Sequence, residues 1–225
     1  MCIRDSVGSS PSMNFSVDYQ YGALSFEIFS NKKKLITNAG YFSNKKSNLN
    51  KLSKSTALHS TLIIEDFSSC SSKKINDNVV VEKGLKVLKK NIVFEKDYWK
   101  ISGSHDGYLK KFGTIHEREI EFYTKQSRFV GHDKILRKNP NYEIKFDIRF
   151  HLDPNVKVMK TQDNKSILIE LEDEGWKFSC DNFKINIDNS LYFGNKNSYK
   201  DNQNIFISGM NKENEQIIKW EIVKL

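Results

Sequence analysis

The sequence predicts an all-β fold, an antiparallel β-sandwich of stacked sheets, supersandwich-like, with little helix. Nearly every periodic segment alternates apolar and polar residues, as expected for antiparallel strands with one face against a core. Stretches rich in Asn, Lys and Ser separate these segments. An apolar stripe at helical spacing does not extend beyond a couple of turns, and Gly84–Lys90 is the one short helix candidate.

The expected strands follow one another along the whole chain. In Ala23–Phe29, large apolar residues alternate with Ser25 and Glu27, and Glu117–Tyr123 and Tyr142–Phe150 place Ile and Phe opposite charged residues. The others are short and mostly rich in β-branched residues: Ser60–Glu65, Asn78–Glu82, Asn91–Glu95, Ser166–Leu171, Gly175–Ser179, Phe183–Ile187, Asn204–Ser208 and Ile217–Lys224.

The segments between them are expected turns, and the chain is expected to form one domain because it has neither a clear linker nor a repeat. Ser30–Lys34, Lys160–Lys165 and Gly194–Asn204 are the main turns. The Lys- and Asn-rich stretch Ser43–Ser55 is predicted to be a long loop, a kind of segment that is often functional or mobile.

The composition is that of a globular protein with a basic surface. Of 225 residues, 38% are hydrophobic and 28% charged, and the net charge of +8 suits an anionic partner. The cations are nearly all Lys, and the runs Lys32–Lys34, Lys45–Lys46 and Lys73–Lys74 are interpreted as solvated loops. Apolar runs fall short of the roughly 20 residues that span a bilayer.

The amino terminus and the cysteines are set apart from this pattern. Met1–Pro11 has no signal-peptide pattern and resembles an adapter-derived leader. Residues 1–12 are therefore expected to be non-native and outside the fold, with the domain over residues 13–225. Cys2, Cys70 and Cys180 are odd in number and lack metal-ligand spacing, which leaves a bridge between the last two open.

Enzyme motifs such as a Walker loop, a dinucleotide fingerprint, HExxH or a nucleophile elbow do not occur. Three groups of segments, however, resemble the carboxy-terminal domain of heparinase II/III-like proteins, especially the proteobacterial branch. The combined SHDGY, HxR and RFHLxP pattern is more specific than any one motif. The segments are Gly22–Gly40 with Ala57–Asp66; Ser104–Arg118; and Phe150–Pro154 with Glu174–Phe178 and Tyr192–Gly194.

The resemblance implies a polysaccharide lyase that cleaves uronic-acid-containing polysaccharide by β-elimination. A base removes the C5 proton, the carboxylate charge is neutralised and the C4–O bond breaks. An upstream α/α toroid domain of the same chain would supply most catalytic groups, so we expect this fragment alone to be inactive. The expected partner is an acidic polysaccharide, and the expected location is the periplasm or cell envelope of a Gram-negative bacterium.

Relatives in the resembled family include members with zinc held by two His and an Asp. Here Asp18 and Gln20 stand where His would be expected, Asn38 stands at the Asp position, and only His59 matches. Zinc favours about four N, S or O ligands, and one His with two amides would bind it poorly. We therefore expect no zinc and no other cofactor, and the departure puts lyase activity of this member in doubt.

The site residues predicted from the motifs are His59 and His105 as catalytic groups and Tyr108 and Arg118 as substrate-binding groups. If the domain packs on a toroid, one sheet face should expose apolar residues and both His should face one cleft. For His59 an ordinary role at the end of a strand fits the sequence about as well as a role in the cleft. A Tyr in a strand, such as Tyr108, is usually a packing residue.

Structural rather than functional roles are expected for the remaining His and for the Trp. His116 is expected to form a cross-strand surface pair and His132 to lie in a loop, whereas His151 is expected to be buried and hydrogen-bonded. The three Trp could stack on sugars, but core packing is the default.

Three functions compete. The first is the accessory domain of a lyase, and the second is a non-catalytic carbohydrate-binding or structural β-domain, which the missing His favour. Nucleic-acid binding is the weakest, because Arg is scarce and no RNA-binding signature occurs.

Overall fold

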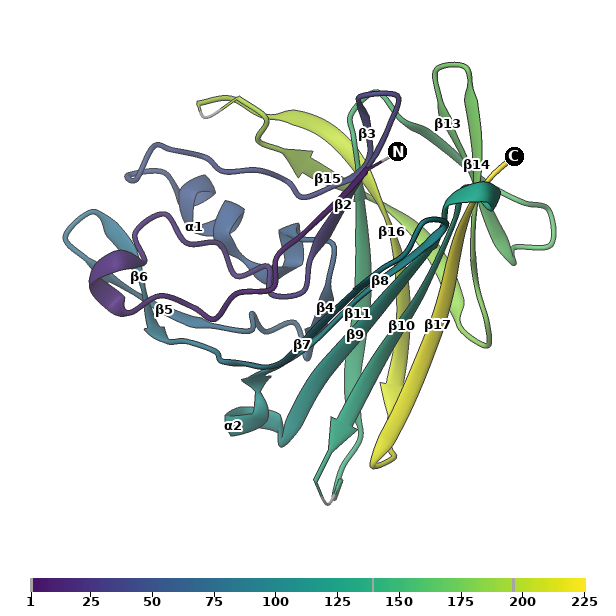
Figure 1. The fold of residues 1–225 in the computed structure, drawn as a ribbon. Coiled ribbons are helices and arrows are strands. Elements are labelled where there is room, and N and C mark those ends of the chain that lie inside the picture. Colours follow the sequence, from purple (N-terminus) through teal and green to yellow (C-terminus); the bar gives the residue numbers. More distant parts are fainter. Residues whose placement is uncertain (1, 139, 196) are drawn as a thin grey trace.

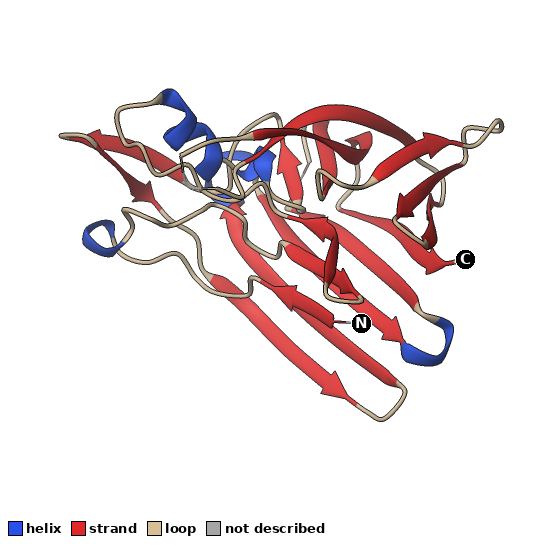
Figure 2. Ribbon diagram, turned by 90° about the horizontal axis from the view of Figure 1, so that it is seen from above, coloured by secondary structure: helices blue, strands red, loops and turns tan. Residues whose placement is uncertain are grey.

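The computed structural model describes residues 2–138, 140–195 and 197–225, and over half of the chain lies in strands. Two large antiparallel sheets stack on each other, which confirms the predicted fold class (Figures 1 and 2). Helix accounts for 9% of the chain. The pieces are the α-helices α1 (Asn48–Lys54) and α2 (Leu109–Phe112), and the 3-10 turns η1 (Met13–Phe15), η2 (Thr56–Leu58) and η3 (Thr124–Gln126).

The first sheet has seven strands in the order β1-β2-β3-β11-β16-β15, with β4 pairing beside β3 on β11. Its members are β1 (Cys2–Asp5), β2 (Phe26–Ser30), β3 (Lys33–Thr37), β4 (Leu62–Ile64), β11 (Ile144–Leu152), β15 (Lys184–Tyr192) and β16 (Lys200–Asn211).

The second sheet has eight strands in the order β12-β13-β14-β17-β10-β9-β8-β7. Its members are β7 (Val87–Phe94), β8 (Tyr98–Tyr108), β9 (Thr114–Tyr123), β10 (Arg128–Arg137), β12 (Lys157–Lys160), β13 (Ser166–Leu171), β14 (Glu174–Cys180) and β17 (Glu215–Lys224). The outermost strand β7 exposes Lys89 and Lys90 in its first half and Ile92 and Phe94 in its second.

An aromatic cluster joins the two sheets. The Trp220 indole of β17 stacks on Phe26 of β2 with ring centroids 5.4 Å apart, and it meets Phe150 of β11 edge-on at 4.9 Å. Phe178 of β14 contacts the same Phe150 ring at 4.8 Å. Offset and edge-on ring pairs add stabilisation beyond the burial of their area. Trp176 and Trp220 are fully buried, which confirms the expected core role for both.

A small lobe stands beside the stacked sheets. It consists of α1 and the two-stranded hairpin β5 (Ser71–Ile75) and β6 (Asn78–Lys83), which lie together on the side away from β13 and β14 (Figure 1). Its own core includes Tyr21, Cys70 and Leu85. Cys70 and Cys180 are both free, so the bridge that the sequence left open is not formed.

All eleven predicted strands overlap observed strands, but several elements differ from the prediction. Ser43–Ser55 contains helix α1 rather than a continuous loop, because Ser47 caps the helix by accepting a hydrogen bond from the Leu49 backbone N–H. Gly84–Lys90 is not helical, and its second half begins β7. The strands β3, β5, β8, β10 and β12 were not predicted.

The amino-terminal segment takes part in the fold, contrary to the expectation that it lies outside. Residues 2–5 form β1, which pairs antiparallel with β2, and Ser6 exchanges backbone hydrogen bonds with Leu24 and Ser25. Met1 lies outside the described residues, and the non-native origin of the segment stays a prediction. Among the described residues, no helix combines the length and apolar character needed to cross a bilayer.

A prediction concerns Gly131, which faces Trp220 across the β10–β17 pair. A Cβ at this position would lie 2.0 Å from the Trp220 ring, so Gly131→Ala must displace the indole at the centre of the aromatic cluster. We expect the free energy of unfolding to fall by about 2–3 kcal/mol, measured by urea denaturation. Gly175→Ala is the control, because its Cβ would first meet Leu225 at 3.5 Å. Equal effects of the two substitutions would contradict this account.

Candidate functional site

Three adjacent strands bring four ionisable side chains together on the inner face of the eight-stranded sheet. His105 of β8 lies opposite His116 of β9, and Arg118 of β9 lies opposite Asp133 of β10. The period of a strand places 116 and 118 on the same face. All four side chains are buried, with exposures of 3% or less. The sequence predicted His105 and Arg118 as site residues but did not predict that they belong to one cluster.

The Asp133 carboxylate is the centre of this cluster. Its Oδ1 accepts hydrogen bonds from His116 Nε2 at 2.6 Å and from Arg118 Nε at 2.8 Å. Its Oδ2 accepts from an Arg118 terminal nitrogen at 3.0 Å and from Trp220 Nε1 at 2.8 Å. The guanidinium therefore binds the carboxylate in a bidentate manner, and four donors compensate the buried charge.

The two histidines continue the cluster as a directed hydrogen-bond chain. The Gly107 backbone N–H donates to His105 Nδ1 at 3.1 Å, so the neutral His105 ring carries its proton on Nε2. That nitrogen lies 3.3 Å from His116 Nδ1 and donates to it. His116 then carries its proton on Nε2, which donates to Asp133. The hydrogen bonds thus run from the Gly107 backbone through both rings to the carboxylate.

Arg118 connects the cluster to the opposite layer. One of its terminal nitrogens donates to the Leu24 carbonyl at 2.9 Å and to the Ser60 carbonyl at 2.7 Å. Leu24 precedes β2 and Ser60 precedes β4 in the seven-stranded sheet. The side chain predicted to bind substrate thus makes four hydrogen bonds to protein groups inside the core.

Burial controls the protonation of these groups. Burial lowers the pKa of His105 well below its ordinary value, and His116 and Arg118 lower it further. Burial also lowers the pKa of His116, although Asp133 opposes the shift. For Asp133 burial would raise the pKa, but the Arg118 charge and the hydrogen bonds from His116 and Arg118 outweigh it and hold the pKa below its ordinary value. The carboxylate is therefore ionised and both imidazoles are neutral.

Tyr108 and His59 are also buried, with exposures of 1% and 2%. The Tyr108 hydroxyl donates to the Leu62 carbonyl at 2.9 Å, and burial raises the pKa of the phenol. His59 follows η2, where its ring fits against Gly22, and its Nε2 has no hydrogen-bond partner among the residues that the structure describes. Burial lowers the pKa of His59 to about 4.

The remaining histidines give mixed results for the sequence predictions. His151 is fully buried, and its ring nitrogens lie 2.9 Å from the Ala57 carbonyl and 3.1 Å from the Ser190 hydroxyl, which confirms its expected role. His116 does pair across strands, but the prediction of a surface pair is wrong because the pair faces the core. His132 lies within β10, so its prediction as a loop residue is wrong.

The residues at the positions expected for zinc ligands do not fit a metal centre. The Asn38 side-chain oxygen accepts a hydrogen bond from the Ser60 backbone N–H at 2.9 Å. The Asp18 carboxylate accepts one from the Tyr41 hydroxyl at 3.0 Å. Among the described residues, no group of three His, Cys, Asp or Glu side chains could hold a metal ion.

The sequence analysis therefore selected residues that are buried in the core, but it did not predict which of them contact one another. His105 and Arg118 belong to the Asp133 cluster, and the Tyr108 ring contacts the His105 ring with centroids 5.7 Å apart. The His59 ring instead packs against Gly22. Asp133 was missed, because it lies among Gly131, His132 and Lys134, where the apolar alternation that indicates a strand is interrupted. Cleft exposure, which the catalytic assignments of His59 and His105 require, does not occur in this arrangement. Both assignments stay predictions.

Solved structures with the same fold include a heparan sulfate lyase and a heparinase. Heparan sulfate lyase HepC from Pedobacter heparinus matches with a TM-score of 0.73 at 14% identity over 91% of this chain and 30% of that chain. A crystal structure of heparinase III matches with a TM-score of 0.66 at 17% identity, over 92% of this chain and 30% of that one. At these identities the likeness establishes the fold.

One curated protein matches about half of the chain. FtsZ-localized protein C from Caulobacter vibrioides is 26% identical in an alignment of 129 positions that covers 53% of this chain and 22% of that protein. The chain thus spans less than a third of the length of each of these relatives. The family model for the heparinase II/III-like C-terminal region matches residues 4–221. The chain therefore belongs to the heparinase II/III-like C-terminal domain family.

Proposed function

We propose that this chain is the β-domain of a polysaccharide lyase that cleaves an acidic, uronate-containing polysaccharide by β-elimination. The observation that carries the proposal is the family membership, together with the fold likeness to heparan sulfate lyases over about nine tenths of the chain. The net charge of +8 suits a polyanionic substrate. We also propose a location in the periplasm or cell envelope of a Gram-negative bacterium, which rests on the family membership alone.

The burial of the predicted groups supports a division of labour between domains. A general base must come within hydrogen-bond reach of the C5 proton. His59 and His105 are at most 2% exposed, and Tyr108 and Arg118 bond to protein carbonyls. We therefore assign the base to an α/α toroid domain of the same protein, and we propose that these four residues shape the wall against which that domain closes.

The edge of the eight-stranded sheet supports packing against another domain. Ile92 and Phe94 of β7 lie opposite Ile101 and Trp99 of β8 on the face that elsewhere forms the core. They are nevertheless 55% and 83% exposed. Large apolar side chains that continue a core face into solvent are typical of surfaces that another element covers.

A non-catalytic carbohydrate-binding or structural role is the second candidate. Two observations favour it. Three of the four side chains predicted to act on substrate, those of His105, Tyr108 and Arg118, hydrogen-bond to other protein groups inside the core, as residues with a structural role do. Moreover, a curated relative bears a name that refers to localisation with FtsZ rather than to catalysis.

Lyase activity separates the two candidates. We expect no turnover by the 225-residue chain alone, because losing the positioned base removes many orders of magnitude in rate. A longer protein that contains the chain and a toroid should produce unsaturated uronate from heparan sulfate or alginate, measured by ultraviolet absorbance. Turnover by the chain alone would contradict the division of labour. No turnover by the longer protein on any uronate polysaccharide would favour the second candidate.

The buried histidines predict an acid-sensitive fold. The pKa of His59 in the folded protein is about 4, and that of His151 is about 3, both below the ordinary 6.5. Between pH 6.5 and 4, these imidazoles are protonated in the unfolded chain but remain neutral in the folded protein. The free energy of unfolding is therefore highest above pH 6.5 and decreases as the pH falls towards 4. His59 alone accounts for about 3 kcal/mol across this window.

Urea denaturation at pH 7, 6 and 5 measures this effect. We expect the free energy of unfolding to fall steadily, and His59→Gln to remove about one proton from the pH dependence between 6 and 5. The slope is the readout, since the substitution also changes the absolute stability. A free energy of unfolding that stays constant from pH 7 to 5 would show that these imidazoles are not held neutral.

A further inference from the structure

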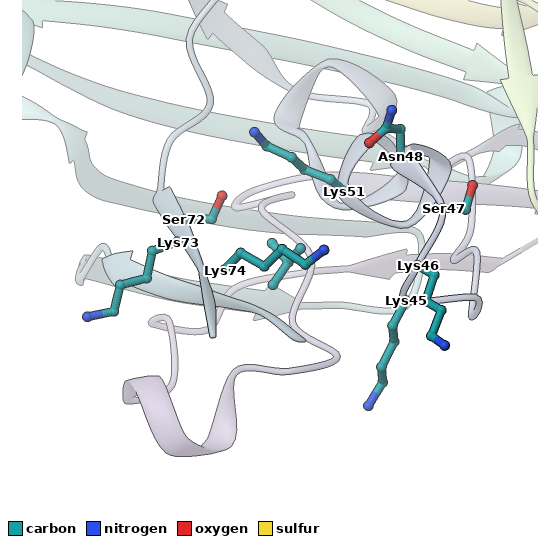
Figure 3. Close-up of a pocket in the computed structure, with 9 residues that line it drawn as sticks. Lys45, Lys46, Ser47, Asn48, Lys51, Ser72, Lys73 and Lys74 are labelled. Atoms are coloured by element: carbon teal, nitrogen blue, oxygen red, sulfur yellow. The ribbon is translucent and has the colours of Figure 1, made fainter. Parts of the chain in front are cut away.

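A groove of about 240 Å³ opens in the small lobe, between the segment that leads into α1 and the β5–β6 hairpin (Figure 3). The residues on one side of the groove are more than 20 positions away in the sequence from those on the other side, and the fold brings the two sides together. We call it the lysine groove. It is lined by Lys45, Lys46, Ser47, Asn48, Lys51, Ser72, Lys73, Lys74 and Val79.

The lysine groove concentrates positive charge without compensation. Five of its nine lining residues are Lys, and none is Asp or Glu. Within the described part of the chain, none of these five ammonium groups forms an ion pair, whereas ten other lysines do. Like charges held together repel one another, and an anion that enters the groove relieves this repulsion.

The side chains are arranged across the groove rather than along one strand. Lys74 extends from β5 towards the segment that carries Lys45 and Lys46, and Lys51 extends from α1 towards β5 (Figure 3). Lys73 points away from the opposite wall in the same view. A ligand in the groove would therefore meet ammonium groups from two sides, and Ser72 and Asn48 are also part of the lining.

Buried contacts fix the two walls relative to each other. Lys54, the last residue of α1, is 1% exposed and donates to the Val79 carbonyl of β6 at 2.8 Å and to the Val17 carbonyl. Asn50 donates to the Phe42 carbonyl at 2.6 Å. These contacts tie the helix to the hairpin and to the preceding loop, so the lysine groove exists before any ligand arrives. A preformed site loses less entropy on binding.

The lining selects among polyanions. Nucleic-acid sites rely on Arg for bidentate contacts and on aromatic rings for stacking on bases. The described lining contains neither, but it combines ammonium groups with hydroxyl and amide groups that suit the charged groups and hydroxyls of sugars. We propose that the lysine groove binds a stretch of acidic polysaccharide, through residues distinct from the four that the sequence predicted. The choice of polysaccharide over other polyanions rests on the proposed function.

The test compares two triple variants of the 225-residue chain with the same net charge. The groove variant carries Lys45→Gln, Lys51→Gln and Lys74→Gln. The control variant carries Lys96→Gln, Lys165→Gln and Lys184→Gln, three exposed lysines outside the lining. The probe is a fluorescent heparan sulfate octasaccharide, and binding is measured by fluorescence anisotropy in low salt and with added salt.

We expect the groove variant to bind about tenfold more weakly than the unmodified chain, and the control variant to change affinity less than twofold. Added salt should weaken binding of the unmodified chain more than that of the groove variant. The octasaccharide should also raise the melting temperature of the unmodified chain, because a ligand of the folded state stabilises it. This rise should disappear in the groove variant.

Three outcomes would overturn the inference. Equal loss of affinity in both variants would show a response to net charge alone. Unchanged affinity in the groove variant would place the polysaccharide elsewhere, a result that leaves the proposed lyase function intact. Tighter groove-dependent binding of a single-stranded DNA 12-mer than of the octasaccharide would assign the groove to nucleic acid. Conversely, groove-dependent octasaccharide binding by a protein without lyase activity would support this inference and contradict the proposed catalysis.

Discussion

The fold depends on the fully buried carboxylate of Asp133. Asp133 lies at the middle of the eight-stranded sheet with no exposure, and placing a charge there costs several kcal/mol unless donors surround it. Arg118, His116 and Trp220 supply four hydrogen bonds. Each donor has a second structural duty: Arg118 reaches the opposite layer, His116 orders His105, and Trp220 stacks on Phe26. The same side chains therefore pack the aromatic core and donate the hydrogen bonds that compensate the charge of Asp133.

Sequence patterning predicted the fold class and eleven strands because their inward residues are apolar, as at Phe146, Ile148 and Phe150 of β11. It missed β8 and β10 for a physical reason. Their inward positions include Gly103, His105, Gly131 and Asp133, where the rule of alternation requires large apolar residues. The missed strands thus carry much of the polar cluster, since buried polar groups and the glycines that admit bulky neighbours break the pattern by which strands are recognised.

The candidate site and the lysine groove also show what sequence patterns do not predict. His105 and Arg118 stood in motif positions and were selected, but burial cannot be read from a motif, and both turned inward. Lys45 and Lys74 were interpreted as members of separate solvated loops. Lys45 does lie in the loop before α1, but the prediction is wrong for Lys74, which lies in strand β5. Only the tertiary arrangement, with Lys54 holding α1 against β6, brings them to one groove. Charge that is local in sequence is predictable, whereas charge gathered from distant segments is not.

The outermost strand β7 has a consequence for how copies of this chain behave in solution. A free strand edge presents unpaired backbone groups on which a neighbouring molecule could add its own strand. In the first half of β7, exposed Lys89 and Lys90 would have to be brought beside the cations of a second copy, which disfavours such edge-to-edge growth. The second half ends in exposed Ile92 and Phe94 and lacks this protection. The colloidal stability of the domain thus depends on what covers the last three residues of one strand.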